Sequence, residues 1–432
     1  MGLKTFFGGV HPKDSKAFCK DVFIETMPPP KLVKIHLSQH IGRPAKPIVK
    51  VGQQVLAGEL IGEAQSAVSC NIHSSVSGKV KKIGLSQNSA GIKSQAIFIE
   101  SDNLDKSLDF PENTNYIHLP KEELLKRIVD GGICGMGGAG FPAHIKLASK
   151  NINTLILNGV ECEPFINADY RLMIEKPDEI VNGMRVFMKI LGCKKGYIGI
   201  EANKPEAIKI MKKSVKHFKE IKVVGLKLKY PQGAEKPLIY ACTKREVPTD
   251  GGLPGDVGVV VQNVATSYAA YEAVRYKKPL YERVLSVSGV AVRKPMNILA
   301  RVGTSMSDVV EFARGTIKDV GKIISGGPMM GVAIPDLECS ISKTTSSILL
   351  FDTKQAKELP EHTCIHCGRC IDVCPLLLLP SRMANASKHS VWKVAKSCGA
   401  QECMLCGCCS YVCPSHIKLV QWISIAKKEL SK

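Results

Sequence analysis

Two copies of one cysteine pattern lie near the C-terminal end of the chain. Each copy reads Cys-x2-Cys-x2-Cys-x3-Cys-Pro, and together they span residues 364–414. In bacterial ferredoxins with this spacing, three cysteines of one run and the last cysteine of the other run hold each [4Fe-4S] cluster. The two segments must therefore fold against each other. The pattern predicts one cluster on Cys364, Cys367, Cys370 and Cys413, and a second cluster on Cys403, Cys406, Cys409 and Cys374.

Zinc binding and a chance enrichment of cysteine are the alternatives, but neither accounts for the same long run occurring twice. Because both cysteine sets are complete, no histidine ligand from His366 or His416 is expected. Pro375 and Pro414 are predicted to occupy the first turn of a helix that leaves each cluster. The eight cysteines outside the two runs share no ligand spacing and are expected to be buried packing residues: Cys19, Cys70, Cys134, Cys162, Cys193, Cys242, Cys339 and Cys398. Cys408, inside the second run next to Cys409, is expected to be a small buried neighbour rather than a ligand.

Length and composition limit the remaining possibilities. At roughly 100 to 200 residues per domain, the 432 residues indicate several domains, and 44% apolar with 23% charged residues excludes a disordered chain. The net charge of +20 favours acidic partners, but basic and aromatic residues are not interleaved, so no nucleic-acid binding is expected. No apolar run is long enough for a membrane span or a signal peptide, so we expect a cytoplasmic chain.

A glycine-rich segment lies in the first half of the chain. Residues 135–142 read GMGGAGFP and contain the pattern G-x-G-x-x-G, which is typical of a phosphate cradle made of backbone N–H groups. The preceding residues 121–130 are predicted to form an amphipathic helix rather than a strand, so this segment is not a Rossmann fingerprint. The glycines therefore approach a ligand in another fold, or they only form a turn.

The segments that follow alternate between predicted strands and helices. Strands are expected at residues 154–158, 197–201, 221–228 and 258–261, and helices at residues 205–218 and 265–275. This alternation predicts an α/β sheet that binds its ligands at the carboxyl ends of the strands. Polar residues follow two of these ends, at 158–164 and at 262–263.

Four motifs resemble, in this order, the flavin and NADH site of the flavoprotein subunit of respiratory complex I. They are GMGGAGFPAHIK at 135–146, NGVECEP at 158–164, YPQGAEKPLI at 230–239 and VQNVAT at 261–266. With the C-terminal cysteine runs and the opening residues FFGGVHP at 6–12, nearly the whole chain resembles the C subunits of Rnf electron-transport complexes.

The resemblance implies a noncovalent FMN and NAD(H) as substrate. It places the FMN on the glycine loop, and Lys146 near the phosphate or the ring edge of the FMN. Asn158, Glu161 and Glu163 would line the flavin and the nicotinamide. The cofactor-binding residues implied in this way are Gly135, Gly137, Gly138, Gly140, Phe141, Lys146, Asn158, Glu161, Glu163, Tyr230, Glu235, Asn263 and Thr266.

The resemblance also implies roles for the remaining members of this set. Phe141 would stack on the dinucleotide, Tyr230 and Glu235 would close the pocket, and Asn263 with Thr266 would hold the flavin phosphate. The carboxylates and Lys146 could instead be surface residues, and Phe141 could belong to the core.

The chain departs from the motifs of the complex I flavoprotein at three positions. The arginine of the glycine loop is Met136 here, the NAD-binding aspartate is Val160, and the first glutamate of the third motif is Ala234. Nucleotide contacts are therefore expected to be fewer or weaker than in that flavoprotein.

A multi-domain α+β fold with four parts follows. Residues 1–110 are expected to form a barrel-sandwich β domain related to biotinyl and lipoyl carriers; it has no lysine in the turn at 63–73 and therefore favours docking over a swinging arm. Residues 111–280 would form the Rossmann-like α/β domain that binds FMN and NADH. Residues 281–345 resemble a β-grasp (SLBB) module, either with or without a ligand of its own. Residues 355–432 would form a helical, ferredoxin-like dicluster domain.

The expected function is that of an oxidoreductase subunit without an acid–base catalyst. A hydride donor and one-electron clusters require a flavin between them. The resemblance implies electron exchange between NAD(H) and the membrane subunits of an ion-translocating ferredoxin:NAD⁺ oxidoreductase, with ferredoxin reached through a partner subunit. Such a chain would lie peripherally on the cytoplasmic face of a bacterial membrane. The alternatives are a soluble flavin and iron–sulfur reductase of the cobalamin-reductase type, or an electron-relay scaffold that binds no nucleotide.

Overall fold

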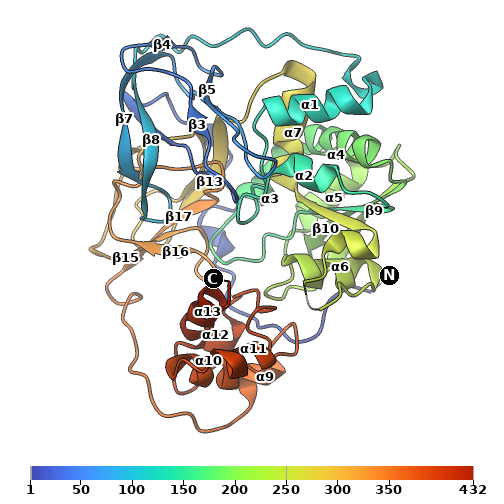
Figure 1. Cartoon of the computed structure of the whole chain (residues 1–432), viewed down its shortest axis with the longest axis vertical. Coiled ribbons are helices and arrows are strands. Elements are labelled where there is room, and N and C mark those ends of the chain that lie inside the picture. Colours follow the sequence, from blue (N-terminus) through green and yellow to red (C-terminus); the bar gives the residue numbers. More distant parts are fainter. Residues whose placement is uncertain (1, 250, 432) are drawn as a thin grey trace.

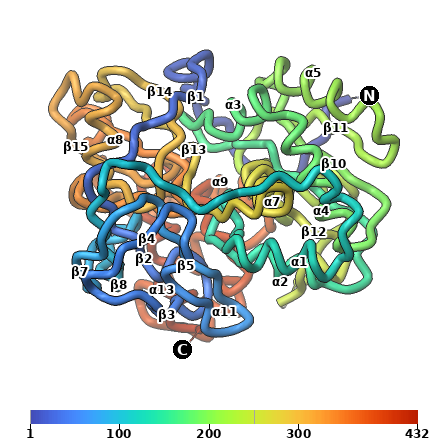
Figure 2. Tube along the Cα trace, turned by 90° about the horizontal axis from the view of Figure 1, so that it is seen from above, coloured from blue at the N-terminus to red at the C-terminus, as the bar shows by residue number. Residues whose placement is uncertain are grey.

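The computed structural model describes residues 2–249 and 251–431. It has the multi-domain α+β architecture expected from the sequence: β-rich parts on one side, a helix-covered sheet on the other, and a small helical domain below them (Figure 1). Figure 2 shows the same parts from above, with the C-terminal residues behind the two sides. Among the described residues, no helix is long and apolar enough to cross a membrane.

The N-terminal domain has two small antiparallel sheets over one core, as the barrel-sandwich prediction required. Alternating side chains such as Val33, Ile35 and Ile99 are fully buried in this core, because successive side chains of a strand point to opposite faces. The sheet orders are β2–β8–β7–β4 and β3–β5–β6. The strands are β2 (Leu32–His36), β3 (Lys46–Pro47), β4 (Gln54–Val55), β5 (Leu60–Glu63), β6 (Ile72–His73), β7 (Gly78–Gln87) and β8 (Lys93–Ser101).

A parallel sheet of order β11–β10–β9–β12 forms the centre of the α/β domain. Helix α6 packs on one face, and α4 and α7 cover the other. The parallel register brings the carboxyl ends of all these strands to one edge, where the polar loops begin. The strands are β9 (Thr154–Asn158), β10 (Lys195–Glu201), β11 (Ile221–Leu226) and β12 (Val259–Asn263); the helices are α1 (Lys121–Asp130), α2 (Ala143–Leu147), α3 (Ala168–Glu175), α4 (Pro177–Leu191), α5 (Pro205–Ser214), α6 (Glu235–Thr243) and α7 (Val264–Tyr276).

These bounds confirm the predicted helix at 121–130 and the predicted strand at 154–158. Two elements are shorter than predicted: α5 ends at Ser214 rather than near residue 218, and β11 ends at Leu226 rather than at 228. Both differences lie at element ends, which sequence patterns locate poorly because apolar periodicity continues into the adjoining turns.

The β-grasp domain contains a sheet of order β1–β14–β13–β17–β15–β16 together with α8. Its edge strand β1 comes from the N-terminal region and pairs in parallel with β14, from Ile24 opposite Asn297 to Thr26 opposite Leu299. No sequence pattern predicted this pairing of two strands that are distant in the sequence. The elements are β1 (Ile24–Thr26), β13 (Glu282–Ser288), β14 (Met296–Arg301), α8 (Met306–Phe312), β15 (Val320–Ser325), β16 (Val332–Ile334) and β17 (Ser347–Asp352).

The C-terminal domain is a bundle of short helices around the two cysteine runs. Pro375 and Pro414 were predicted to begin helices, and this prediction was wrong: both lie in turns, and the next helices begin only at Pro380 and Leu419. The chain must reverse after the fourth cysteine of each run, and Leu377 and His416 have positive φ angles there. The helices are α9 (Arg369–Asp372), α10 (Pro380–Lys388), α11 (Trp392–Ser397), α12 (Cys408–Tyr411) and α13 (Leu419–Glu429).

Residues 4–10, here called the N-terminal strap, connect the α/β domain to the C-terminal domain. Lys4 pairs with the end of β11, and Val10 exchanges two backbone hydrogen bonds with Tyr230, at 2.8 and 2.9 Å. Between them, the Gly9 N–H donates to the Val373 carbonyl at 2.8 Å. A Cβ on Gly8 would lie 2.8 Å from the Cys374 carbonyl oxygen, so only glycine fits this close approach.

A buried histidine makes the stability of the N-terminal domain depend on pH. His36 is 2% exposed, with Nδ1 2.8 Å from Ser94 Oγ and Nε2 3.1 Å from the Gln87 carbonyl. Burial lowers the pKa of His36 to about 4. Between pH 6.5 and 4 the unfolded chain binds a proton at His36 that the folded chain excludes. The free energy of unfolding should therefore decrease by about 3 kcal/mol as the pH is lowered from 6.5 to 4.

Hydrogen exchange in β7 and β8 of the full chain, corrected for intrinsic rates, measures this loss. His36→Gln should reduce the pH dependence, whereas His217→Gln, at an exposed histidine, should leave it unchanged. Equal pH dependence in both variants would contradict the assignment.

Candidate functional site

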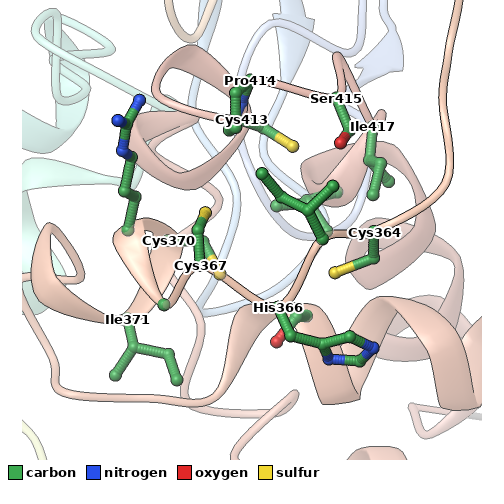
Figure 3. Close-up of a pocket in the computed structure, with 14 residues that line it drawn as sticks. Cys364, His366, Cys367, Cys370, Ile371, Cys413, Pro414, Ser415 and Ile417 are labelled. Atoms are coloured by element: carbon green, nitrogen blue, oxygen red, sulfur yellow. The ribbon is translucent and has the colours of Figure 1, made fainter.

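The structure brings Cys364, Cys367, Cys370 and Cys413 together around one cavity of about 150 Å³. In Figure 3 the sulfur atoms of these cysteines face a common space, and Ser415 and Ile417 lie on the same side of it as Cys364. Cys367 is exposed and the other three are half-buried. This grouping is the one that the crossed ligand pattern predicted.

The second predicted set, Cys374, Cys403, Cys406 and Cys409, lines a smaller cavity of about 20 Å³. Three of these cysteines are buried and Cys403 is half-buried. Within residues 2–249 and 251–431, no three His, Cys, Asp or Glu side chains are grouped so that one metal ion could be held. The thiolates of a [4Fe-4S] cluster bind different iron atoms and so stand further apart than zinc ligands do, and both all-cysteine sets fit such a cluster.

Cys408 also lines the second cavity, but its thiol has another partner. Its Sγ lies 3.8 Å from the Tyr230 carbonyl, to which it donates, and the side chain is 1% exposed. Of the eight cysteines outside the runs, seven are buried, as expected for packing residues, and Cys162 is half-buried. Cys162 belongs to the polar loop after β9, where its sulfur accepts a hydrogen bond from Gly233 N at 3.4 Å.

The glycine loop lies between α1 and α2 and is held at Met136. Thr266 Oγ1 accepts a hydrogen bond from Met136 N at 2.9 Å, and Arg283 Nη2 donates to the Met136 carbonyl at 3.0 Å. Residues 137–139 are exposed, and a Cβ built on Gly138 meets nothing within 4 Å. The loop therefore offers an open face made of backbone, as a phosphate or flavin cradle needs.

Two of the predicted phosphate-binding side chains have structural partners instead. Thr266 is fully buried under the glycine loop. Asn263 caps α7 by accepting from Ala265 N at 2.8 Å, and its Nδ2 donates to Asp169 at 2.7 Å. Both residues thus shape the loop from below, and their contact with a phosphate remains a prediction.

Lys146 and Glu235, predicted from separate motifs, meet in the structure. Lys146 Nζ lies 2.6 Å from Glu235 Oε1 and 3.2 Å from the Val261 carbonyl. Asn158 is placed nearby by β9, and its Nδ2 donates to the Gly233 carbonyl at 2.7 Å. The carboxyl-end edge of the sheet therefore collects these three predicted residues. Phe141 is half-buried beside the loop.

The two glutamates after β9 point into the protein. Glu161 accepts hydrogen bonds from Asp169 N at 2.7 Å and Tyr170 N at 3.3 Å, at the start of α3. Burial raises the pKa of Glu161. Glu163 accepts from Met329 N at 3.0 Å and Met330 N at 2.8 Å, in the β-grasp domain. Both carboxylates fix neighbouring segments, and a contact of either with a nucleotide remains a prediction.

Tyr230 does not lie at the mouth of an open pocket. It is 2% exposed, and its hydroxyl donates to the carbonyl of Cys406 at 2.9 Å. Two positions at which the chain departs from the complex I motifs hold packing residues: Met136 is 4% exposed and Val160 is fully buried.

Sequence patterns missed several residues at this edge. Arg283 holds the glycine loop, and Lys16 and Lys204 donate to carbonyls of the loop after β9. Gln232, fully buried beside Gly233, has no hydrogen-bond partner for either polar side-chain atom among the described residues. A buried unpaired amide is unusual in a folded protein, and it fits a site that is completed by a polar ligand such as FMN.

Family comparisons divide the chain into the same series of modules. The RnfC barrel sandwich hybrid domain matches residues 4–104, the Nuo51 FMN-binding domain residues 128–272, the SLBB domain residues 284–333, and the 4Fe-4S dicluster domain residues 362–417. Fold and site therefore define a flavin and iron–sulfur protein of electron transfer, with FMN and two [4Fe-4S] clusters as cofactors.

Curated relatives match along almost the entire chain. The C subunit of the proton-translocating ferredoxin:NAD(+) oxidoreductase complex of Clostridium ljungdahlii is 46% identical, over 91% of this chain and 87% of its own length. The corresponding subunit of the Na(+)-translocating complex of Acetobacterium woodii is 42% identical, over 99% of this chain and 97% of its own. This chain belongs to the family of C subunits of ion-translocating (Rnf) oxidoreductase complexes.

Among solved structures, an NAD⁺-reducing [NiFe]-hydrogenase in the air-oxidized state has a TM-score of 0.49 at 18% identity, covering 66% of this chain and 55% of that chain. This similarity is too weak to support a statement on fold or function.

Single substitutions of Cys406 and Cys408 distinguish a predicted cluster ligand, Cys406, from a neighbouring cysteine that is not predicted to bind a cluster. Cys408→Ser should keep both clusters, because serine preserves the size of the side chain and the crossed pattern does not use Cys408. Cys406→Ser should lose about half of the bound iron, the content of one of two [4Fe-4S] clusters. Iron analysis and EPR of the anaerobically purified variants measure this. Loss of a cluster in Cys408→Ser would show that the assigned ligand set is wrong.

Proposed function

We propose that this chain exchanges electrons between NAD(H) and the membrane subunits of an ion-translocating ferredoxin:NAD⁺ oxidoreductase complex. The observation that carries this proposal is that one chain combines an exposed backbone cradle in an FMN-binding domain with two cavities that are each lined by four predicted cysteine ligands. When bound, FMN would supply the chemistry that links the carriers, because a flavin can exchange a hydride with NAD(H) and single electrons with a [4Fe-4S] cluster.

The residues of the chain bind and orient rather than form bonds. Gly135, Gly137, Gly138 and Gly140 provide the backbone cradle for the FMN, with Lys146 at its edge. The dinucleotide would contact Phe141, Asn158 and the two glutamates after β9. The eight cysteines of the two predicted sets bind the clusters: Cys364, Cys367, Cys370, Cys413, Cys374, Cys403, Cys406 and Cys409.

The domain limits and the location of the chain are part of the proposal. The limits are 1–110, 111–280, 281–345 and 355–432, and the sheet of the third part is completed from outside these limits by β1 and β17. Partner subunits would hold the chain on the cytoplasmic face of a bacterial membrane, and electrons would reach ferredoxin through one of them. The names of the relatives from Clostridium ljungdahlii and Acetobacterium woodii, each a subunit of an ion-translocating ferredoxin:NAD(+) oxidoreductase complex, support the assignment to a complex with partner subunits.

An anaerobic titration of the cluster-loaded, FMN-supplied chain with NADH tests the function. We expect the flavin absorbance to bleach first and the cluster absorbance to follow if the cluster potentials permit. If the bound FMN stays oxidised while dithionite reduces the clusters, the chain is an electron relay without a nucleotide site. The buried Met136 and Val160, which replace polar residues of the complex I motifs, make this the second candidate.

Gly138→Ala tests whether the glycine loop contacts the flavin. A Cβ at this position meets no protein atom within 4 Å, so the unfolding of the flavin-free chain should not change. FMN affinity should fall about tenfold, or about 1.4 kcal/mol, because the methyl group would occupy the space of the ligand. Fluorescence titration with FMN measures the affinity.

Gly137→Ala is the matched comparison. Its Cβ would lie 2.8 Å from Nδ2 of Asn263, so it should destabilise the loop even without FMN. Unchanged FMN affinity in Gly138→Ala would place the flavin elsewhere.

A further inference from the structure

The two cluster cavities differ in their position relative to the α/β domain. Cys406 and Cys408 share an apolar contact cluster with Val10 and Tyr230, and Cys162 from the loop after β9 packs against it. The first cavity, in contrast, is lined by Ile365, which is 66% exposed, and by the exposed Cys367. One cavity therefore faces the flavin domain and the other faces the surface of the chain.

Direct contacts join the inner cavity to the α/β domain. The Tyr230 hydroxyl donates to the Cys406 carbonyl at 2.9 Å, and the Cys408 thiol donates to the Tyr230 carbonyl at 3.8 Å. Lys236 at the start of α6 lies 3.3 Å from Glu402, next to Cys403. On the other side, the N-terminal strap holds Val373, next to Cys374, through Gly9. Three of the four predicted ligands of this cavity are thus fixed, directly or through a chain neighbour, against the flavin domain.

Glu163 connects this junction to the β-grasp domain. Its carboxylate accepts the N–H groups of Met329 and Met330, and the Tyr230 hydroxyl lies against it. A Cβ on Gly407, the residue after Cys406, would lie 3.2 Å from the Met329 carbonyl. The loop of the β-grasp domain thus touches both the polar loop after β9 and the cysteine loop, which gives this domain a structural role at the junction.

We propose that the two clusters have different electron partners. The inner cluster, on Cys374, Cys403, Cys406 and Cys409, exchanges electrons with the flavin, and the outer cluster, on Cys364, Cys367, Cys370 and Cys413, exchanges them with the partner subunit. Tyr230 is the positioning residue of the inner cluster. The proposal rests on the proposed function. A hydrogen bond to the carbonyl of a ligand stabilises the extra negative charge of the reduced cluster, so Tyr230 also raises its potential. One electron moves per step, and no bond forms or breaks.

Tyr230→Phe removes the hydroxyl and keeps the ring. We expect flavin reduction by NADH to be unchanged and electron transfer from the flavin to the inner cluster to slow about tenfold in stopped-flow absorbance. In a mediated titration with dithionite, one cluster should become up to about tenfold harder to reduce, which is 59 mV for one electron.

Tyr116→Phe is the control, because Tyr116 is also buried in the α/β domain, edge-on to Tyr271 at 5.8 Å, in the core of α1 and α7. It should change neither the potentials nor the transfer rate. A merely structural role of Tyr230 would lower the stability of Tyr230→Phe but would not move the potential of one cluster alone.

Cys367→Ser identifies the cluster that Tyr230 affects. It should alter the EPR signal of the outer cluster, and Tyr230→Phe in the same chain should still shift the other signal. The assignment is overturned if Cys367→Ser and Tyr230→Phe alter the signal of the same cluster. It is also overturned if Tyr230→Phe shifts the potential of neither cluster. A chain that fails to oxidise NADH would overturn the proposed function. The dithionite titration needs no NADH, so it decides the assignment of the inner cluster independently of that result.

Discussion

Two buried lysines hold the loop between β9 and α3, and the arrangement of the site depends on them. Lys204 Nζ donates to the Val160 carbonyl at 2.7 Å, and Lys16 Nζ donates to the Glu163 and Ile166 carbonyls at 2.9 and 2.5 Å. Their side chains are 1% and 6% exposed. Burying a charge is costly unless it is paired and hydrogen-bonded, and Glu201 and Glu161 provide the opposite charges.

The position of this loop fixes three domains relative to one another. The loop directs Glu163 toward Met329 and Met330 of the β-grasp domain and toward Tyr230, which in turn contacts Cys406. Lys16, which holds the loop, comes from the N-terminal region that also supplies the strap and β1. The first residues of the chain therefore act as a connection between parts that are distant in sequence.

The barrel-sandwich domain contacts the end of the glycine loop at Gly140. In its turn between β5 and β6, the Ala67 carbonyl lies 3.0 Å from Nε2 of His144 in α2. The Asn71 carbonyl accepts a hydrogen bond from Nζ of the buried Lys343. The Ile41 N–H donates to the Gly140 carbonyl at 3.3 Å. In lipoyl carriers this turn bears the modified lysine; here it packs against the α/β domain, which supports docking rather than swinging.

The sequence by itself determined the local features of this protein. Cysteine spacing predicted which cysteines would share a cavity, and hydrophobic periodicity located the strands and the helix at 121–130, because both depend on residues close together in the chain. Only the tertiary structure decided what Tyr230, Glu163 and Thr266 contact, where β1 pairs, and which cluster lies next to the flavin domain. These features depend on contacts between residues up to hundreds of positions apart, and no periodic pattern of side chains records such contacts.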